Sequence, residues 1–291
     1  MAYINTPILL AILGTVCFGA GMISSRLGLR DADARTGAAI SVPTATLLFV
    51  ISAPFTVDAA TFNLDAALIF AAVGLFYPAM VTLITFRSNE LLGPTMTSAI
   101  SGTAPLFAIL AAALLLGEQV PAQVAVAALG VAAGVALLSW QPGLSLHALH
   151  GRALLWPVGG ALLRGLAQTG AKAGLLVWAN PFAASLIGYL VSSAAVFGAA
   201  HARSGGRRQA SAAGKRWFIA TGIINGAAMV LMYGALAQAP VSTVAPIIAA
   251  YPLVTVLGSA LFLREETLRP QMVCGAIITV AAVAWLAAHR T

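Results

Sequence analysis

The sequence predicts an all-α integral membrane protein with ten transmembrane helices in two inverted five-helix repeats. Three observations predict this class: the scarcity of charge, ten apolar stretches of membrane-spanning length, and one motif that occurs twice. Of the 291 residues, 60% are hydrophobic and 8% are charged, and the mean hydropathy is +0.95. Because soluble domains carry about 25% charged residues, this chain has too little charge to solvate a globular surface, and lipid is its expected solvent.

The ten apolar stretches each have about the length of a helix that crosses a hydrocarbon core roughly 30 Å thick. Turn-forming pairs separate several of them, as at Gly93-Pro94 and Asn180-Pro181. No connection between them is long enough to form an extramembrane domain. The expected spans are 6–27, 36–57, 66–86, 94–116, 121–140, 153–175, 180–200, 217–237, 241–263 and 270–289.

Lysines and arginines gather in the loops on one side of the membrane. The loops after the even-numbered spans hold none, apart from Arg290 past the last span. The positive-inside rule therefore places both termini outside, in a multi-pass protein of the bacterial cytoplasmic membrane. The net charge of +7 is explained by these loops, and no nucleic-acid partner is expected. The loops after the odd-numbered spans hold Arg30, Arg35, Arg87, Arg152, Arg203, Arg207, Arg208, Lys215, Arg216, Arg264 and Arg269.

A fifteen-residue motif occurs once in each half of the chain, as "APLFAILAAALLLGE" and "YPLVTVLGSALFLRE". Each copy has proline in second place and glutamate in last place. Pro105 and Pro252 are 147 residues apart, and so are Glu118 and Glu265. The coincidence indicates two homologous halves, each containing five spans.

The halves are predicted to be residues 1–145 and 146–291. Because five is an odd number of crossings, the second half enters the membrane from the opposite face. The two halves are then related by a pseudo-two-fold axis in the membrane plane. This is the plan of secondary transporters, which bind substrate near the midplane between their repeats and open alternately to either side.

The doubled Pro-x(12)-Glu motif and the five-plus-five spans resemble the drug/metabolite transporter superfamily in its EamA-type branch. The resemblance covers essentially the whole chain and is greatest to bacterial YddG-type exporters of aromatic and other amino acids. It implies that the first four helices of each half line a central cavity, and that the last helix of each half lies outside, often at a dimer contact. We expect a monomer or weak homodimer, without cofactor or catalytic activity.

Charged residues in the span 153–175 are the exception to an apolar membrane region. Arg164, Gln168 and Lys172 follow one another at intervals of four, so they share one helix face. Because an unpaired cation in lipid is costly, this face is expected to line the cavity. Arg164 then either anchors a substrate carboxylate or bonds the carbonyls of a broken helix, and both interpretations stay open. Lys172 is better explained as reaching the interface.

Other polar and aromatic positions are candidates for the same cavity, although each alone is also explained by packing. Together they predict a cavity with a polar part and an apolar, aromatic part, which suits a neutral or aromatic amino acid. The prolines that adjoin them free backbone carbonyls and allow bending. The cavity candidates are Tyr77, Thr97, Ser98, Ser101, Asn225, Met229, Tyr233, Ile247 and Tyr251, and the hinge candidates are Pro78, Pro105 and Pro252.

Acidic residues and histidines are absent from the middle of every expected span. Glu118 and Glu265 lie at helix ends, where a structural role is favoured over gating or coupling. Proton-driven pumps usually place a carboxylate or histidine inside the membrane, so a facilitator or exchanger is expected. His147 and His150 are expected in a solvated loop, without metal. The alternatives are a multidrug or other metabolite exporter, and a structural or receptor-like membrane protein without flux.

Overall fold

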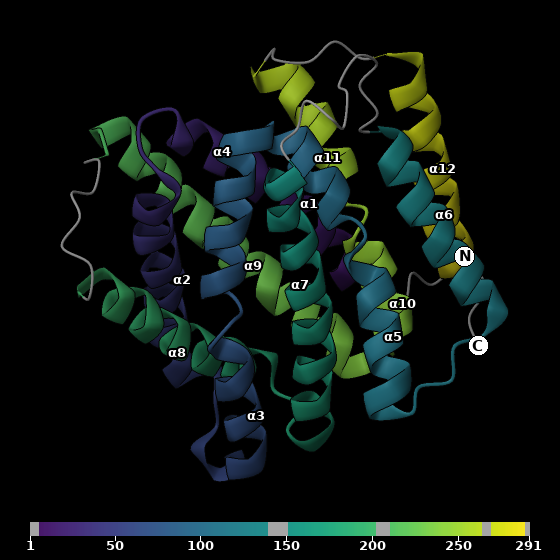
Figure 1. The fold of residues 1–291 in the computed structure, drawn as a ribbon. Coiled ribbons are helices and arrows are strands. Elements are labelled where there is room, and N and C mark those ends of the chain that lie inside the picture. The colour runs from purple at the N-terminus through teal and green to yellow at the C-terminus, as the bar shows by residue number, and fades with distance from the viewer. Residues whose placement is uncertain (1–5, 139–150, 202–209, 264–268, 289–291) are drawn as a thin grey trace.

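The computed structural model describes residues 6–138, 151–201, 210–263 and 269–288, and all regular structure in these ranges is helical (Figure 1). Each of the ten expected spans therefore contains helix. In chain order the elements are α1 (Thr6–Leu29), α2 (Ala34–Thr56), η1 (Ala59–Thr61), α3 (Leu64–Gly74), α4 (Ala79–Ser101), α5 (Ala104–Leu116), α6 (Ala122–Leu138), α7 (Gly151–Val177), α8 (Pro181–His201), α9 (Ala212–Gln238), α10 (Val241–Ile248), α11 (Tyr251–Gly258), η2 (Ser259–Leu263) and α12 (Pro270–Ala288).

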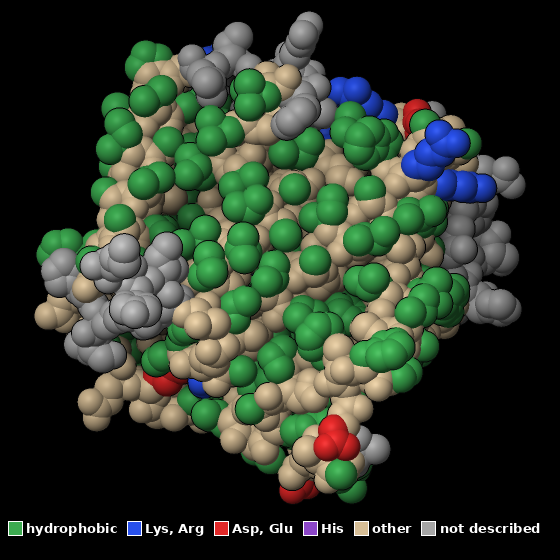
Figure 2. All heavy atoms as spheres, turned by 180° about the vertical axis from the view of Figure 1, so that it is seen from behind, with side chains coloured by type: hydrophobic (Ala, Val, Ile, Leu, Met, Phe, Trp, Pro, Cys, Tyr) green, Lys and Arg blue, Asp and Glu red, His purple; other side chains and the backbone are tan. Residues whose placement is uncertain are grey.

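The helices have the length and apolar surface of a membrane protein. Within the described ranges, seven helical spans are long and apolar enough to cross a membrane, and α5 and α6 are shorter apolar helices. The remaining long helix is α7, with 27 residues; it contains Arg164 and Lys172. Figure 2 shows hydrophobic side chains across the middle of one face, with charged side chains toward its margins. These features confirm the prediction of an all-α integral membrane protein.

Three of the expected spans are interrupted helices. The span 66–86 is built from α3 and the first part of α4, and the span 94–116 from the rest of α4 and α5. The span 241–263 contains α10, α11 and the π-helical turn η2. Pro105 and Pro252 stand in the first turns of α5 and α11, where the missing amide of proline costs no helical bond. The hinge candidates Pro105 and Pro252 thus begin new helices, and their role as hinges stays a prediction.

A sharp kink divides α4 at Gly93. This residue has φ 79° and ψ 168°, a conformation that is strained for any residue with a Cβ atom. The expected turn at Gly93-Pro94 is therefore present, although the helix resumes directly after it. Thr97, Ser98 and Ser101 therefore belong to a helical segment that this kink separates from the first part of α4.

Helices of the first half pack mainly against helices of the second half. α1 lies along α9, α2 contacts α8 and α9, and α7 contacts both α4 and α5. α6 and α12 pair with each other at one side of the bundle (Figure 1). Their backbones approach closely, because a Cβ atom at Gly275 would meet the amide nitrogen of Leu138 and the carbonyl oxygen of Gly134. This pair corresponds to the last helix of each predicted half.

Some predicted features lie outside the described residues. The proposed boundary near residue 145 falls between Leu138 and Gly151, as do His147 and His150. Glu265 also lies outside the described ranges. The predictions for these positions stay predictions.

Candidate functional site

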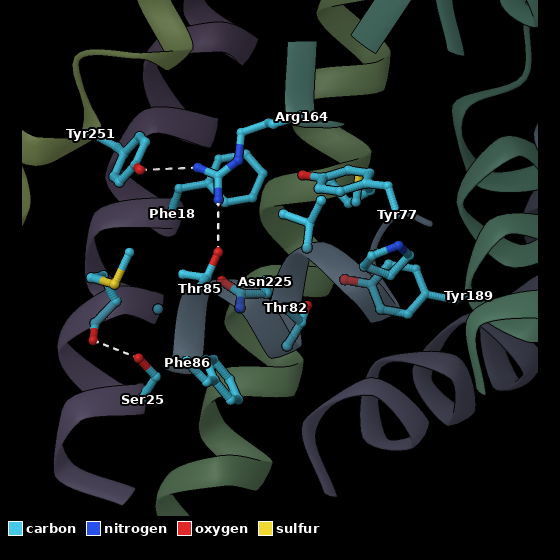
Figure 3. Close-up of a pocket in the computed structure, with 15 residues that line it drawn as sticks. Phe18, Ser25, Tyr77, Thr82, Thr85, Phe86, Arg164, Tyr189, Asn225 and Tyr251 are labelled. Atoms are coloured by element: carbon cyan, nitrogen blue, oxygen red, sulfur yellow. Dashed lines mark hydrogen bonds between the residues drawn. The ribbon is translucent and has the colours of Figure 1, made fainter. Parts of the chain in front are cut away.

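A cavity of about 50 Å³ lies between helices of both halves (Figure 3). Since one water needs about 10–15 Å³ by this measure, the cavity has room for a few waters, and a larger ligand requires it to widen. Its walls come from α1, α4, α7, α8, α9, α11 and the turn before α4. The lining residues are Phe18, Gly21, Met22, Ser25, Tyr77, Pro78, Val81, Thr82, Thr85, Phe86, Arg164, Tyr189, Asn225, Met229 and Tyr251.

Arg164 reaches into this cavity from the middle of α7 (Figure 3). Its Nη1 donates to the hydroxyl of Tyr251 at 3.0 Å, and its Nη2 donates to Oγ1 of Thr85 at 3.2 Å. The guanidinium carbon lies 5.4 Å from the centroid of the Tyr251 ring. Both hydrogen-bond partners are neutral, and no carboxylate of the described residues pairs with this cation.

The guanidinium keeps capacity for an anion. It has five N–H donors, and the described residues satisfy two of them. Its Nε is buried without a partner. Arginine binds carboxylates and phosphates through two parallel hydrogen bonds. A cation held by two hydroxyls in a small cavity is therefore suited to a ligand with an anionic group.

Aromatic rings make up much of the remaining wall. Phe18 and Tyr251 are tilted toward each other with ring centroids 6.5 Å apart. Tyr77 and Tyr189 lie on the opposite side in the view of Figure 3, and both are buried. Phe86 closes another part of the wall. This surface can pack against an apolar or aromatic group while Arg164 holds an anionic one.

Neutral polar groups surround the end of the cavity near Ser25. Asn89 donates from Nδ2 to Oγ of Ser25 at 3.0 Å, and Ser25 donates to the carbonyl of Met22 at 2.8 Å. The amide side chain of Asn225 comes from α9 and fits against Gly21, where a Cβ atom would collide with its Oδ1. The site thus contains one cation together with hydroxyls and amides.

The structure brings together about half of the residues that the sequence nominates. Tyr77, Arg164, Asn225, Met229 and Tyr251 line the cavity, and so does the hinge candidate Pro78. The other candidates are buried without lining it in this conformation. That they contact a ligand in another conformation stays a prediction. These buried candidates are Thr97, Ser98, Ser101, Gln168, Tyr233 and Ile247.

Several of those buried candidates have identifiable surroundings. Thr97 shares a hydrogen bond of 3.0 Å with Ser88 on the same helix. Oγ of Ser98 and Oε1 of Gln168 are buried without a hydrogen-bond partner. The carbonyl of Ile247 accepts from Oγ1 of Thr15 at 2.8 Å.

Sequence reasoning missed residues on α1, α4 and α8. Thr82 and Thr85 precede Ser88 and Asn89 in an apolar stretch, and this recurrence every three or four residues would have indicated a polar helix face. Aromatic residues in an apolar span carry no comparable signal. The lining residues missed are Phe18, Gly21, Met22, Ser25, Val81, Thr82, Thr85, Phe86 and Tyr189.

Glu118 and Lys172 hold the turn between α9 and α10. The two carboxylate oxygens of Glu118 accept from the backbone amides of Val241 at 2.9 Å and Ser242 at 3.1 Å. Nζ of Lys172 donates to the carbonyls of Leu236 at 2.8 Å and Ala239 at 3.1 Å. Of the predicted face on α7, only Arg164 therefore lines the cavity. No group of three His, Cys, Asp or Glu side chains suited to a metal was found in the described part of the chain.

Comparison with known proteins gives one family. A model of the EamA-like transporter family matches residues 5–140 and again residues 151–288. A solved structure titled only "Crystal structure of protein" is similar in fold, with a TM-score of 0.73 and 15% identity, over 96% of this chain and 94% of that one. No curated protein matches the sequence. The two family matches fall on the two predicted halves.

Proposed function

Because the chain belongs to the EamA-like transporter family, we propose that it moves amino acids and related small carboxylates across the bacterial cytoplasmic membrane by alternating access. The observation that carries this proposal is the guanidinium of Arg164. It lines the cavity, its partners are the hydroxyls of Tyr251 and Thr85, and no described carboxylate neutralises it. Since an isolated cation inside a membrane is costly, a substrate carboxylate is its natural counter-ion.

The walls around Arg164 support neutral and aromatic substrates. Phe18, Tyr77 and Tyr189 offer ring faces to an apolar side chain, whereas Ser25 and Asn225 offer hydrogen bonds. The amino group of the substrate would meet only neutral acceptors, because no acidic side chain is among the lining residues. This composition supports an exporter or facilitator of the YddG type, with aromatic amino acids among its substrates.

Coupling to protons has no evident group in this cavity. The lining residues contain neither a carboxylate nor a histidine. We therefore propose a facilitator or exchanger. A multidrug exporter of organic cations is less well supported, since such a substrate would meet Arg164 and no acid.

The test is uptake of radiolabelled compounds into proteoliposomes that contain the purified protein. Phenylalanine, leucine, lysine and glutamate are compared side by side with an organic cation and a neutral sugar. The proposal predicts saturable uptake of phenylalanine and leucine. Uptake of the cation or the sugar alone would replace the proposal with a different substrate class, and ligand binding without flux would indicate a receptor-like protein.

A further inference from the structure

We propose that Glu118 and Lys172 form a lock on the turn Ala239–Pro240, and that release of this lock opens the cavity toward the end of the bundle where α5 meets α10. The inference rests on the proposed function only in assuming that the protein changes between two conformations. The positive-inside prediction places this end outside the cell.

The carboxylate part of the lock joins the first half of the chain to the second. α5 is capped by Gly117, whose φ of 66° lies in the left-handed region, and the next residue, Glu118, reaches α10. The first amides of a helix have no partner within it, and Pro240 supplies no side-chain cap. Glu118 satisfies the amides of Val241 and Ser242. The bonds are charge-assisted and favoured by the helix dipole.

The cationic part binds the other side of the same turn. Leu236 lies in the last turn of α9 and Ala239 caps this helix. Their carbonyls also lack helical partners, and Lys172 binds both. The lysine is 9% exposed, so these two bonds replace most of its contact with water. A carboxylate and an ammonium thus fix the two sides of one turn, each through backbone groups that water could satisfy once the turn moves.

The helix that this lock holds belongs to the core that adjoins the cavity, since Ile247 lies in the same cluster of buried side chains as Tyr77 and Met229. Seven of the eight residues of α10 are buried, and it packs against α1, α5, α6 and α7 (Figure 1). Lys172 is eight residues beyond Arg164 on α7, or about 12 Å along the helix at 1.5 Å per residue. In the proposed opening, a path from Arg164 to this end forms when α10 leaves this core.

The same movement reaches the ligand site. Only Ala249 and Ala250 separate α10 from Tyr251, whose hydroxyl accepts the hydrogen bond from Arg164. A substrate carboxylate that pairs with Nη1 of Arg164 would compete with that hydroxyl. Displacement of Tyr251 and release of α10 are therefore connected through two residues of backbone.

The repeat provides an independent argument. Nη1 of Arg26 donates to the carbonyl of Asn89 at 3.3 Å. Arg26 is 146 residues before Lys172, and Asn89 is 147 residues before Leu236. The first helix of each half thus places a cation on the carbonyl end of a later helix of the same half. Because the halves are inverted, the two contacts belong to opposite ends of the bundle, as alternating gates require.

The test measures the labelling rate of engineered cysteines in the protein reconstituted in nanodiscs, in a background that carries Cys17→Ser and Cys274→Ser. One reporter is Ser242→Cys at the buried start of α10. The other is Ser25→Cys, on the side of the cavity away from the lock. Both are labelled with a charged maleimide, and gel filtration and the melting temperature establish that each variant is folded.

Glu118→Gln is expected to raise labelling at position 242 about tenfold and to lower it at position 25. Glutamine keeps one acceptor oxygen and loses the charge, and a tenfold shift corresponds to about 1.4 kcal/mol. The matched control is Glu90→Gln. Glu90 also caps a helix, through the amide of Ala34 at 2.6 Å, but it joins two helices of the same half. Because Glu90 follows Asn89, which bonds both Arg26 and Ser25, the control applies to position 242, where the labelling rate is expected to stay unchanged.

The lock is disproved if Glu118→Gln leaves position 242 unchanged, or if Glu90→Gln has the same effect. A rise at both reporters would indicate general loosening and would also overturn the proposal. If Glu118→Gln does not fold, Lys172→Gln takes its place with the same expected result. Because labelling needs no substrate, failure of amino-acid uptake with opening at position 242 would refute the proposed substrate and leave the lock intact.

Discussion

Replacing Arg164 by alanine removes the only cation among the lining residues of the cavity. The hydroxyls of Tyr251 and Thr85, which accept its hydrogen bonds, can bond water in its place, so the fold should persist. For a substrate carboxylate, two charge-assisted hydrogen bonds are lost, each worth about 1.5 kcal/mol at the low end of the measured range. The sum of about 3 kcal/mol corresponds to a loss of affinity of roughly 100-fold.

The assay compares uptake of phenylalanine with that of phenylalaninamide, which has the same ring and no carboxylate. Arg164→Ala is expected to raise the KM for phenylalanine by about 100-fold and to leave uptake of the amide nearly unchanged. Arg164→Lys keeps the charge without the planar fork of donors, so an intermediate loss is expected. Arg35→Ala, which removes an exposed arginine, is the control. Equal losses for both compounds, or no loss for either, would refute the assignment of Arg164 as a carboxylate anchor.

Three further predictions concern a tyrosine of the cavity wall, the close packing of two helices and the coupling of transport to protons. Tyr251→Phe removes the acceptor of one Arg164 hydrogen bond. In uptake assays we expect the KM for phenylalanine to change by up to about tenfold. A change as large as that caused by Arg164→Ala would contradict this minor role of the Tyr251 hydroxyl. Gly222→Ala would place a Cβ atom against the carbonyl oxygen of Ser41. The free energy of unfolding should therefore fall by about 1–3 kcal/mol, which is measured as a lower melting temperature. Gly159→Ala, whose Cβ atom would meet nothing within 4 Å, should leave the melting temperature unchanged. Uptake of phenylalanine should be the same with and without a pH gradient, because no acid or histidine lines the cavity; a requirement for the gradient would show that coupling residues lie elsewhere.

The sequence predicted the spans well because membrane helices are recognisable by length and composition alone. Arg164 was identifiable for the same reason, since a charge in an apolar span stands out. It was harder to predict which side of each helix faces the cavity, the other helices or the lipid. In lipid, the surface that packs against other helices is about as apolar as the surface that faces the bilayer, so Phe18 and Tyr189 gave no sign of lining a cavity.

Helix breaks within the spans, and contacts between the two halves, explain the other differences between the predicted site and the structure. Thr97, Ser98 and Ser101 form a polar stripe in the sequence, but they follow the kink at Gly93 and are buried away from the cavity. Glu118 was expected to have a structural role at a helix end, and its bonds to the amides of α10 could not be foreseen. They depend on how the two halves are placed against each other, which no local pattern encodes.

Counterflow of phenylalanine shows whether this protein carries amino acids through the membrane. Proteoliposomes are loaded with unlabelled phenylalanine and diluted into a trace of the labelled compound, without a pH gradient. If the protein is an alternating-access carrier, the label accumulates transiently inside the proteoliposomes above its external concentration. This accumulation disappears when the internal phenylalanine is omitted. If the label inside never exceeds the amount bound by detergent-solubilised protein, the protein is not a carrier of phenylalanine.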